Sequence, residues 1–286
     1  MRTDLVPVSA GAVTLASASA SISVSTAVPA RASASALLSG PAACPLESLG
    51  FDPADSELLR RTVRAPSGLV LVVGPRRSGL STTLAALRAA LPPAADLPPD
   101  AEPDLLFLDP PPSPAAALSA IASIPGGCRV FSSLALERAA HVFGHFHALG
   151  LPPSRLARDL LLVVAQCRVA RLCPTCRQPD RSADLRQAFA LASNTWLHGV
   201  PVAACLPFPG GCAACAGTGF SGHALAYECL VVDAGVRALA EHGSIGLELE
   251  QALFAGGRSL WDHGLRRVAA GVCSLGALRA AVREPG

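Results

Sequence analysis

The feature that most restricts how this chain can fold is a strand, a glycine-bounded loop and a helix in direct succession. Leu69–Val73 is wholly aliphatic, which is typical of a strand buried on both faces, and Thr82–Ala90 has the composition of a helix. Between them, Gly74–Ser81 matches the phosphate-binding pattern G-x-x-x-x-G-K-[ST] at every fixed position except the lysine. The succession predicts a nucleotide-type loop, and the alternative is an ordinary strand-to-helix turn.

The residues of such a loop have different tasks, and only the task of the lysine is missing here. Glycines let backbone N–H groups surround a phosphate and Ser81 offers a hydroxyl to Mg²⁺, but Leu80 stands where a lysine would neutralise phosphate oxygens. We therefore expect ATP and Mg²⁺ to bind weakly or not at all. A substitute charge from the loop's own arginines would require a side chain to fold back over the loop. The candidate nucleotide-binding residues are Gly74, Pro75, Arg76, Arg77, Ser78, Gly79, Leu80, Ser81 and Thr82.

The charge pattern gives no sign of nucleic-acid binding. The 23 basic residues are all arginine and are scattered among 21 acidic ones, which leaves a net charge of +2. Because the chain contains no lysine at all, a drift in composition could have removed the loop lysine, and a chain that tolerates this loss does not need fast hydrolysis. At 286 residues the chain is long enough for one or two domains.

The hydrophobic segments predict a cytoplasmic protein. The aliphatic run Leu160–Ala165 is far shorter than the roughly 20 residues that span a bilayer. The uncharged stretch 5–30 resembles a secretory signal in composition, but Asp4 stands where positive charge is expected and serines interrupt the apolar part. The alternation of Ala18–Ser25 instead predicts a strand with one buried face.

Further strands and helices alternate downstream of the loop. Leu105–Leu108 and Arg129–Ser132 are predicted strands separated by helical stretches, which is the pattern of a doubly wound α/β domain. From Tyr227 onward, the short predicted strand Leu230–Val232 is followed by helices. These helices are expected to contain Val236–Glu241, Leu247–Phe254 and Ser274–Val282.

Paired cysteines form the strongest local chemical signal. Cys173 and Cys176 form one C-x-x-C pair, and Cys212 and Cys215 form a second after 35 intervening residues. Two such pairs complete a closed tetrahedral shell of thiolates, which is typical of a structural zinc ion that takes no part in chemistry. The alternatives are two disulfides, which a reducing cytosol disfavours, or a redox pair. The other cysteines are isolated, and we expect most of them to be small buried apolar residues: Cys44, Cys128, Cys167, Cys205, Cys229 and Cys273.

Four blocks of the sequence carry a resemblance to a known family. Leu156–Cys176 looks like a helix leading into the first cysteine pair, and Gly211–Asp233 looks like the second pair and a glycine-rich hairpin. Gly257–Gly271 is similar to a C-terminal helical segment, and Ile22–Thr26 to the last strands of a preceding domain. In these blocks the chain resembles the type II secretion and type IV pilus assembly ATPases, the family of general secretion pathway protein E and the pilus extension motors.

The resemblance implies a RecA-like P-loop NTPase core, a small four-cysteine zinc segment and a helical C-terminal part. Residues 1–40 would be the remnant of a preceding β-containing domain, 41–165 the core, 166–225 the zinc-binding segment and 226–286 the helical C-terminal segment. The resemblance also implies partners, namely secretion or pilus motor subunits in a homo- or hetero-hexamer, and inner-membrane platform proteins. The chain would then be cytoplasmic, with a peripheral position at the inner membrane.

The chain departs from the family where the chemistry is expected. Pro110 occupies the place of the glutamate that orients the attacking water, and Ala135 replaces the family's histidine. The proline-rich link Pro92–Pro103 has no counterpart of the family's acidic segment, and Ser23 stands in the place of one phosphate-binding arginine. Asp109, at the end of its strand, remains as a residue that could hold Mg²⁺ through water.

Three histidines lie near the altered positions. His141, His145 and His147 fall on a predicted helix, but their spacing does not put all three on one face. We therefore expect surface or packing roles for them rather than a metal or proton-transfer site.

The combined loss of catalytic groups determines the order of three candidate functions. Phosphoryl transfer depends on positioning and charge stabilisation, so the loss of the lysine, the glutamate and the histidine removes most of what accelerates it. The first hypothesis is a pseudo-ATPase, with weak or no hydrolysis, that acts in assembly of the secretion or pilus motor. The second is a slow but active ATP-hydrolysing motor subunit that uses Asp109 and a cation from a neighbouring subunit. The third is a zinc-stabilised protein interaction module without a motor partner.

Overall fold

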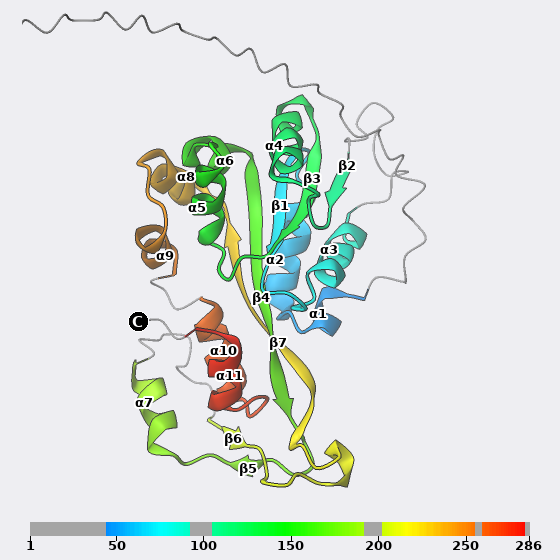
Figure 1. Cartoon of the computed structure of the whole chain (residues 1–286), viewed down its shortest axis with the longest axis vertical. Coiled ribbons are helices and arrows are strands. Elements are labelled where there is room, and N and C mark those ends of the chain that lie inside the picture. Colours follow the sequence, from blue (N-terminus) through cyan, green and yellow to red (C-terminus); the bar gives the residue numbers. More distant parts are fainter. Residues whose placement is uncertain (1–43, 92–104, 192–201, 255–258, 284–286) are drawn as a thin grey trace, which may run out of the picture. The chain divides into compact units, whose positions relative to one another are not determined.

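The computed structural model describes residues 44–91, 105–191, 202–254 and 259–283, which form an α/β fold around a five-stranded sheet (Figure 1). The strand order is β2-β3-β1-β4-β7, and all pairs are parallel except the antiparallel pair β4–β7. The predicted α/β class is confirmed. The strands are β1 (Gly68–Val73), β2 (Leu105–Leu108), β3 (Arg129–Leu134), β4 (Leu160–Leu172), β7 (Phe220–Val231), and a separate small pair, β5 (Gln178–Pro179) and β6 (Cys205–Leu206).

Helices pack on both faces of the sheet because its strands are apolar on both sides. Along β1, Leu69, Leu71 and Val73 belong to one apolar cluster, and Val70 and Val72 to the other. The helices that bury residues in the first cluster are α4 (Pro114–Ser123), α5 (His141–Ala148), α6 (Pro153–Asp159), α8 (Ala234–Glu241) and α9 (Leu247–Phe254). The helices of the second cluster are α1 (Leu46–Leu49), α2 (Pro53–Val63) and α3 (Leu80–Ala89).

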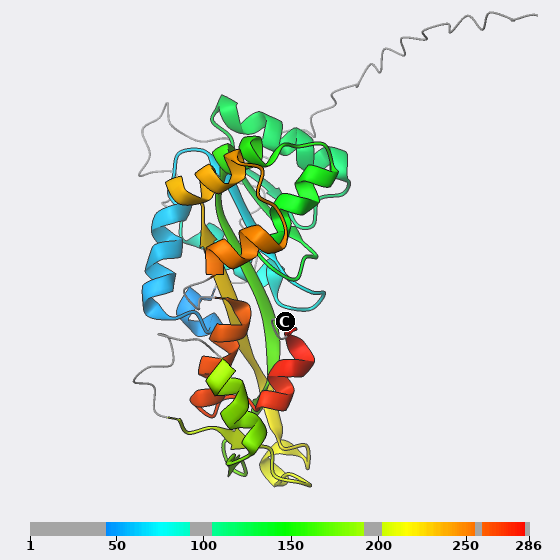
Figure 2. The ribbon, with the colours of Figure 1, turned by 90° about the vertical axis from the view of Figure 1, so that its left-hand side faces the viewer.

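A third apolar cluster covers the far part of β4 and β7. The strand β4 continues past the end of its pairing with β1 and forms, with β7, a ribbon against which the C-terminal helices lie (Figure 2). The cluster includes Cys167 and Val169 of β4, Ala226 of β7 and Trp261. Its helices are α7 (Ala183–Leu191), α10 (Leu260–Ala269) and α11 (Leu275–Ala281), and two short 3-10 turns complete the fold, η3 (Ile124–Gly126) and η4 (Ala213–Cys215).

The prediction of a helix that leads into the first cysteine pair is wrong for most of that segment. The helical part ends at Asp159, and Leu160–Leu172 forms the 13-residue strand β4. Its first half is a continuous apolar run that β1 flanks in parallel, which is the composition of a strand buried on both faces. Its second half pairs with β7, so the residues after the second cysteine pair form one long strand rather than a hairpin of their own. The predicted strand Leu230–Val232 is the end of β7.

A buried carboxylate joins β7 to two neighbouring segments. Glu228 is 1% exposed and accepts hydrogen bonds of 2.6 Å from the backbone N–H groups of Ala139 and Leu260. Arg138 lies 3.2 Å from the same carboxylate and 2.6 Å from that of Glu250. The start of α10 is therefore held to the central sheet by a charge that is paired and hydrogen-bonded inside the protein.

The segments expected from residues 1–40, including Ala18–Ser25, Ile22–Thr26 and Ser23, lie outside the described residues, as does the link 92–103. The strand β4 runs across position 165/166, where the core was predicted to meet the zinc-binding segment. None of the helices in the described ranges combines the length and the hydropathy needed to span a membrane.

Candidate functional site

The nucleotide-type loop lies at the carboxyl edge of the parallel strands. It follows β1 directly, and α3 begins at Leu80, with Gly79 as the preceding residue in a left-handed conformation (φ +89°). Asp109 directly follows β2 at the same edge, and Ser133 lies near the end of β3. Ligands of open α/β sheets bind outside this edge, so the predicted strand, loop and helix have the right arrangement for phosphate binding.

Contacts within the chain hold the backbone of the loop. The Ser78 N–H donates to the Pro75 carbonyl at 3.2 Å, and Arg77 lies between them with φ +67°. A Cβ atom at Gly74 would lie 2.3 Å from the Gln166 carbonyl oxygen and 2.6 Å from Ser78 Oγ. Gly74 is therefore required by close backbone approach, and the turn keeps its shape through contacts within the chain.

The side chains of the loop supply little that would bind phosphate. Leu80 is half-buried, packs against the apolar cluster of α1, α2 and α3, and approaches Gly74. The side chains of Arg76, Arg77 and Ser81 are exposed. The remaining predicted binding residues are Pro75 and Thr82, which are exposed, Gly79, which is half-buried, and Ser78, whose buried hydroxyl has no hydrogen-bond partner.

Asp109 does not stand free at the strand end. The Ser133 hydroxyl donates a short hydrogen bond to its carboxylate, and the Ser132 hydroxyl donates to the Leu108 carbonyl at 2.8 Å. Pro110 and Ala135, which the sequence resemblance places where the family has its glutamate and histidine, are both exposed and carry no titratable group. These two positions therefore offer no proton acceptor, and Asp109 is the carboxylate after β2 that could hold Mg²⁺.

The three histidines lie on α5, as predicted from the sequence. The imidazole of His141 lies 3.9 Å from the Glu250 carboxylate, and the ring of His145 packs edge-on against Phe146 at 5.3 Å. His147 is exposed.

The four paired cysteines converge, although 35 residues lie between the two pairs. The Sγ atoms of Cys173, Cys176, Cys212 and Cys215 all lie within 4.8 Å of one another. Three of the S···S distances are 3.8, 3.9 and 3.8 Å, close to the roughly 3.8 Å edge of a tetrahedron with Zn–S bonds of about 2.3 Å. The set therefore fits a zinc ion in a closed shell, and the predicted ligands are brought together.

Backbone groups beside Cys215 favour its thiolate. The N–H groups of Cys212 and Gly219 both donate to Cys215 Sγ at 3.2 Å, and the bond from Cys212 is the main cause that lowers the pKa of this thiol to about 6. A Cβ atom at Gly211 (φ +59°) would lie 2.4 Å from the carbonyl carbon of Gly217, so the turn needs glycine there. Of the isolated cysteines, Cys128, Cys167 and Cys273 are buried as expected, whereas Cys205 and Cys229 are half-buried and Cys44 is exposed.

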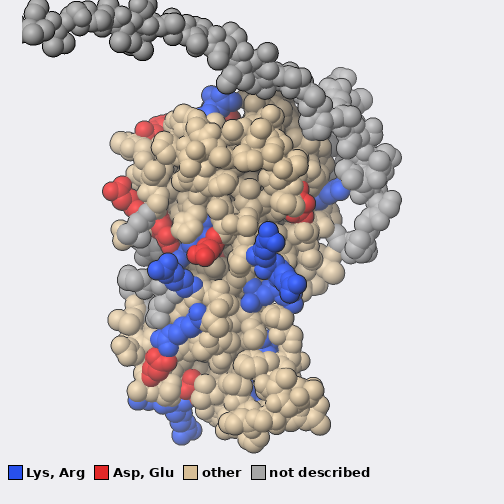
Figure 3. All heavy atoms as spheres, in the orientation of Figure 1, with Lys and Arg blue, Asp and Glu red and all other residues tan. Residues whose placement is uncertain are grey.

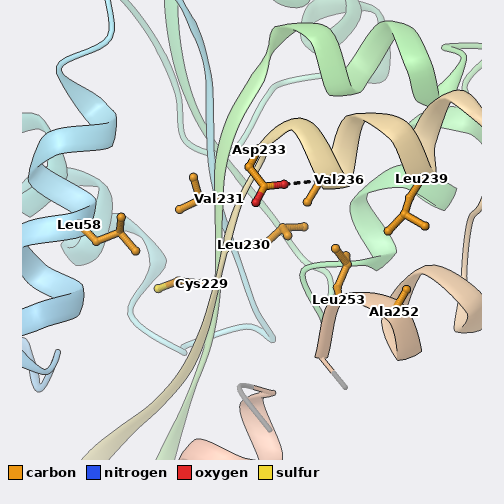
Figure 4. A pocket seen from close by; sticks show the side chains of 10 residues that line it. Leu58, Cys229, Leu230, Val231, Asp233, Val236, Leu239, Ala252 and Leu253 are labelled. Carbon is orange, nitrogen blue, oxygen red and sulfur yellow. Dashed lines mark hydrogen bonds between the residues drawn. The ribbon is translucent and has the colours of Figure 1, made fainter. Parts of the chain in front are cut away.

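A pocket of about 540 Å³ lies elsewhere, at the edge strand β7 between α2, α8 and α9 (Figure 4). Leu58, Val231 and Leu239 are among its lining residues, and its acidic residue, Asp233, accepts from the Val236 N–H at 2.9 Å as the cap of α8. The pocket shares no residue with the loop or the cysteine cluster. On the face shown in Figure 3, basic and acidic side chains lie in separate small groups.

Gln166 is the loop contact that the sequence did not reveal. It lies on β4 and is 1% exposed, and its side chain reaches both Ser78 and Thr83. The available signal was an uncharged polar residue directly after the apolar run Leu160–Ala165.

The fold and the two sites define an α/β protein with a nucleotide-type loop at the sheet edge and a cluster of four cysteines that fits a metal ion. Residues 113–280, more than half of the chain, match the family model described as "Type II/IV secretion system protein", and the chain belongs to this family. The resemblance seen in the sequence is thereby confirmed.

Relatives from several bacteria match most of this chain. Type II secretion system protein E of Dickeya dadantii is 28% identical over 262 residues, which are 79% of this chain and 51% of the relative. The protein of the same name from Pseudomonas aeruginosa is 28% identical over 283 residues, which are 84% of this chain and 53% of the relative. The chain thus spans about half the length of these relatives.

Solved structures show the same fold. The pilus retraction motor PilT with bound ADP aligns with a TM-score of 0.58 at 14% identity, over 86% of this chain and 69% of that one. The ATPase DotB of Legionella pneumophila aligns with a TM-score of 0.52 at 12% identity, over 83% of this chain and 64% of that one.

Proposed function

We propose that this chain keeps the nucleotide-type loop mainly as a structural frame, hydrolyses ATP weakly or not at all, and acts in assembly of a secretion or pilus motor. The proposal rests mainly on the position of the Leu80 side chain. Its apolar side chain packs against the core and beside Gly74, where the family's pattern brings a charge to the phosphates. Pro110 and Ala135 remove the groups expected to handle the attacking water.

The proposed partners follow from the family. Two of its relatives are named type II secretion system protein E, and its structural neighbours include the pilus retraction motor PilT with bound ADP and the ATPase DotB. The proposed role is a cytoplasmic subunit of a homo- or hetero-hexameric ring, or a protein that docks on an inner-membrane platform. Zinc held by the four cysteines would stabilise the fold and stay outside the chemistry. The proposed role involves no nucleic acid. The expectation that the chain has no nucleic-acid partner stays a prediction.

Asp109 supports a second candidate, a slow ATPase. Its carboxylate lies at the same edge of the sheet as the loop and is oriented by Ser133, so it could hold Mg²⁺ if a neighbouring subunit supplied the missing cation. This candidate predicts measurable turnover in the assembled ring and none in the isolated chain.

The replacement of Leu80 by lysine tests the central observation. We expect Leu80→Lys to tighten MgATP binding by about 1.5–3 kcal/mol, roughly ten- to a hundredfold in Kd, because it restores a charged hydrogen bond to phosphate. Leu80→Met is the matched control, because methionine has an unbranched side chain, as lysine does, but is apolar and carries no charge. Titration calorimetry gives the affinities, and phosphate release gives the turnover.

The outcomes separate the candidate functions. Robust turnover by the unaltered chain alone would remove the pseudo-ATPase proposal, and turnover only with a motor homologue present would favour the slow ATPase. Failure to copurify with any full-length motor homologue would leave the zinc-stabilised interaction module as the better description.

A further inference from the structure

A buried glutamine of the sheet holds the loop from beneath. Gln166 Nε2 donates to the Ser78 carbonyl at 2.9 Å, and Gln166 Oε1 accepts from the Thr83 hydroxyl at 2.8 Å. Ser78 is 3% exposed, Thr83 2% and Gln166 1%, so these bonds are shielded from water. One side chain of β4 thus connects the loop to the first turn of α3.

The two partners allow one orientation of the glutamine amide. A carbonyl oxygen only accepts, so the NH₂ group must face Ser78, and the amide oxygen is then left to accept from Thr83. Each contact therefore fixes the other, and the pair acts as a unit.

The anchored carbonyl determines where the next N–H points. In a trans peptide, the Ser78 C=O and the Gly79 N–H lie in one plane and point in opposite directions. With the carbonyl turned toward Gln166, the Gly79 N–H is directed away from β4, to the side on which a loop of this kind surrounds phosphate. The half-buried Gly79 makes no hydrogen bond through this N–H within the described part of the chain.

We propose that Gln166 is a positioning residue of the loop, which orients the Gly79 N–H for an anion before any ligand arrives. The inference rests on the proposed function only in naming a nucleotide phosphate as that anion. A preorganised donor binds without the cost of ordering the loop, so Gln166 offsets part of the loss caused by Leu80.

The test compares two variants, Gln166→Met and Thr83→Val. Valine is closer in shape to threonine than methionine is to glutamine, so the second variant is less prone to disturb the fold. In the zinc-loaded full chain, we expect Gln166→Met to speed amide hydrogen exchange of segment 74–83 at least tenfold and to weaken MgATP binding about tenfold, which is about 1.4 kcal/mol. Thr83→Val should give a smaller change of the same kind, and the double variant should resemble Gln166→Met alone because the two act as a unit. Gln251→Met, at an exposed glutamine of α9, is the matched control and should change neither quantity.

The exchange measurement needs no ligand, which separates the two proposals. If the unaltered chain binds no ATP but Gln166→Met still loosens the loop, the proposed nucleotide binding fails and the positioning role stands. Unchanged exchange in both variants, or faster exchange spread evenly over the chain together with lower zinc content, would overturn the inference and leave Gln166 as a packing residue.

Discussion

Arg77 has a backbone conformation that glycine adopts without strain. Its φ of +67° costs an L residue about 1–2 kcal/mol, whereas glycine pays about 0.5–1 kcal/mol through its greater freedom in the unfolded chain. We expect Arg77→Gly to be neutral or to raise the free energy of unfolding by up to about 1 kcal/mol. Arg76→Gly, one position earlier and without positive φ, should lower it by about 0.5–1 kcal/mol. Urea unfolding measures both, and equal losses in the two variants would contradict the strain.

The roles of some single residues can be predicted from the sequence, and those of others cannot. The loop glycines and the four cysteines could be predicted because their spacing along the chain is itself the chemical pattern. Gln166 could not, because its partners Ser78 and Thr83 are 88 and 83 residues away and no local pattern specifies these contacts. The strain at Arg77 was equally hidden, since it becomes visible only with the backbone angles.

At the scale of the elements, α10 docks on β7 through a buried histidine. His263 is 4% exposed, its Nδ1 accepts from the Tyr227 N–H at 3.3 Å, and its Nε2 lies 3.8 Å from the Asp52 carboxylate. Burial, helped by the charges of Arg266 and Arg267, lowers the pKa of His263 below its usual value despite Asp52. The folded protein therefore favours the neutral imidazole.

This lowered pKa predicts the pH dependence of stability. Because the folded state resists protonation of His263, its contribution is present above about pH 6.5 and is lost as the pH falls through the lower pKa of the folded state. We expect His263→Asn, whose side-chain oxygen can still accept from Tyr227, to flatten the decline between about pH 7.5 and about pH 5. Unfolding free energies of both proteins over this range give the difference, and a decline of equal slope in the two would speak against a role for His263.

The strand β4 shows why one element was assigned wrongly. Its residues Leu160–Ala165 are apolar without a break, a pattern that fits a buried helix and a buried strand equally. The choice depends on β1 and β7, which flank β4 in space and are far from it in sequence. By contrast, α8, α9 and α11 have caps or local periodicity of their own, and their predicted positions are confirmed.

For the whole molecule, the metal centre should decide the stability of the β4–β7 ribbon and its helices. The cysteine cluster joins the chain before β7 to the end of β4, beside the third apolar cluster. We expect about one zinc per chain, and we expect Cys212→Ser or a chelator to remove it and to lower the Tm markedly, since structural zinc contributes directly to folding. Cys44→Ser, at an exposed isolated cysteine, is the control and should keep its metal. Elemental analysis with thermal unfolding checks this, and zinc-free protein of unchanged Tm would contradict it.

The loop and the metal centre are linked by one strand. Gln166 and Cys173 are seven residues apart, with β4 ending one residue before the cysteine, and an extended chain of this length covers about 23 Å. In mechanical terms, tension applied at the cysteine cluster passes along the covalent backbone of β4 to the residue that grips the loop. Because the cluster also holds the chain before β7, the same pull acts on both strands in one direction and does not shear the hydrogen bonds between them. A force on the cysteine cluster, as from a docked partner, is thus transmitted along β4 to the loop.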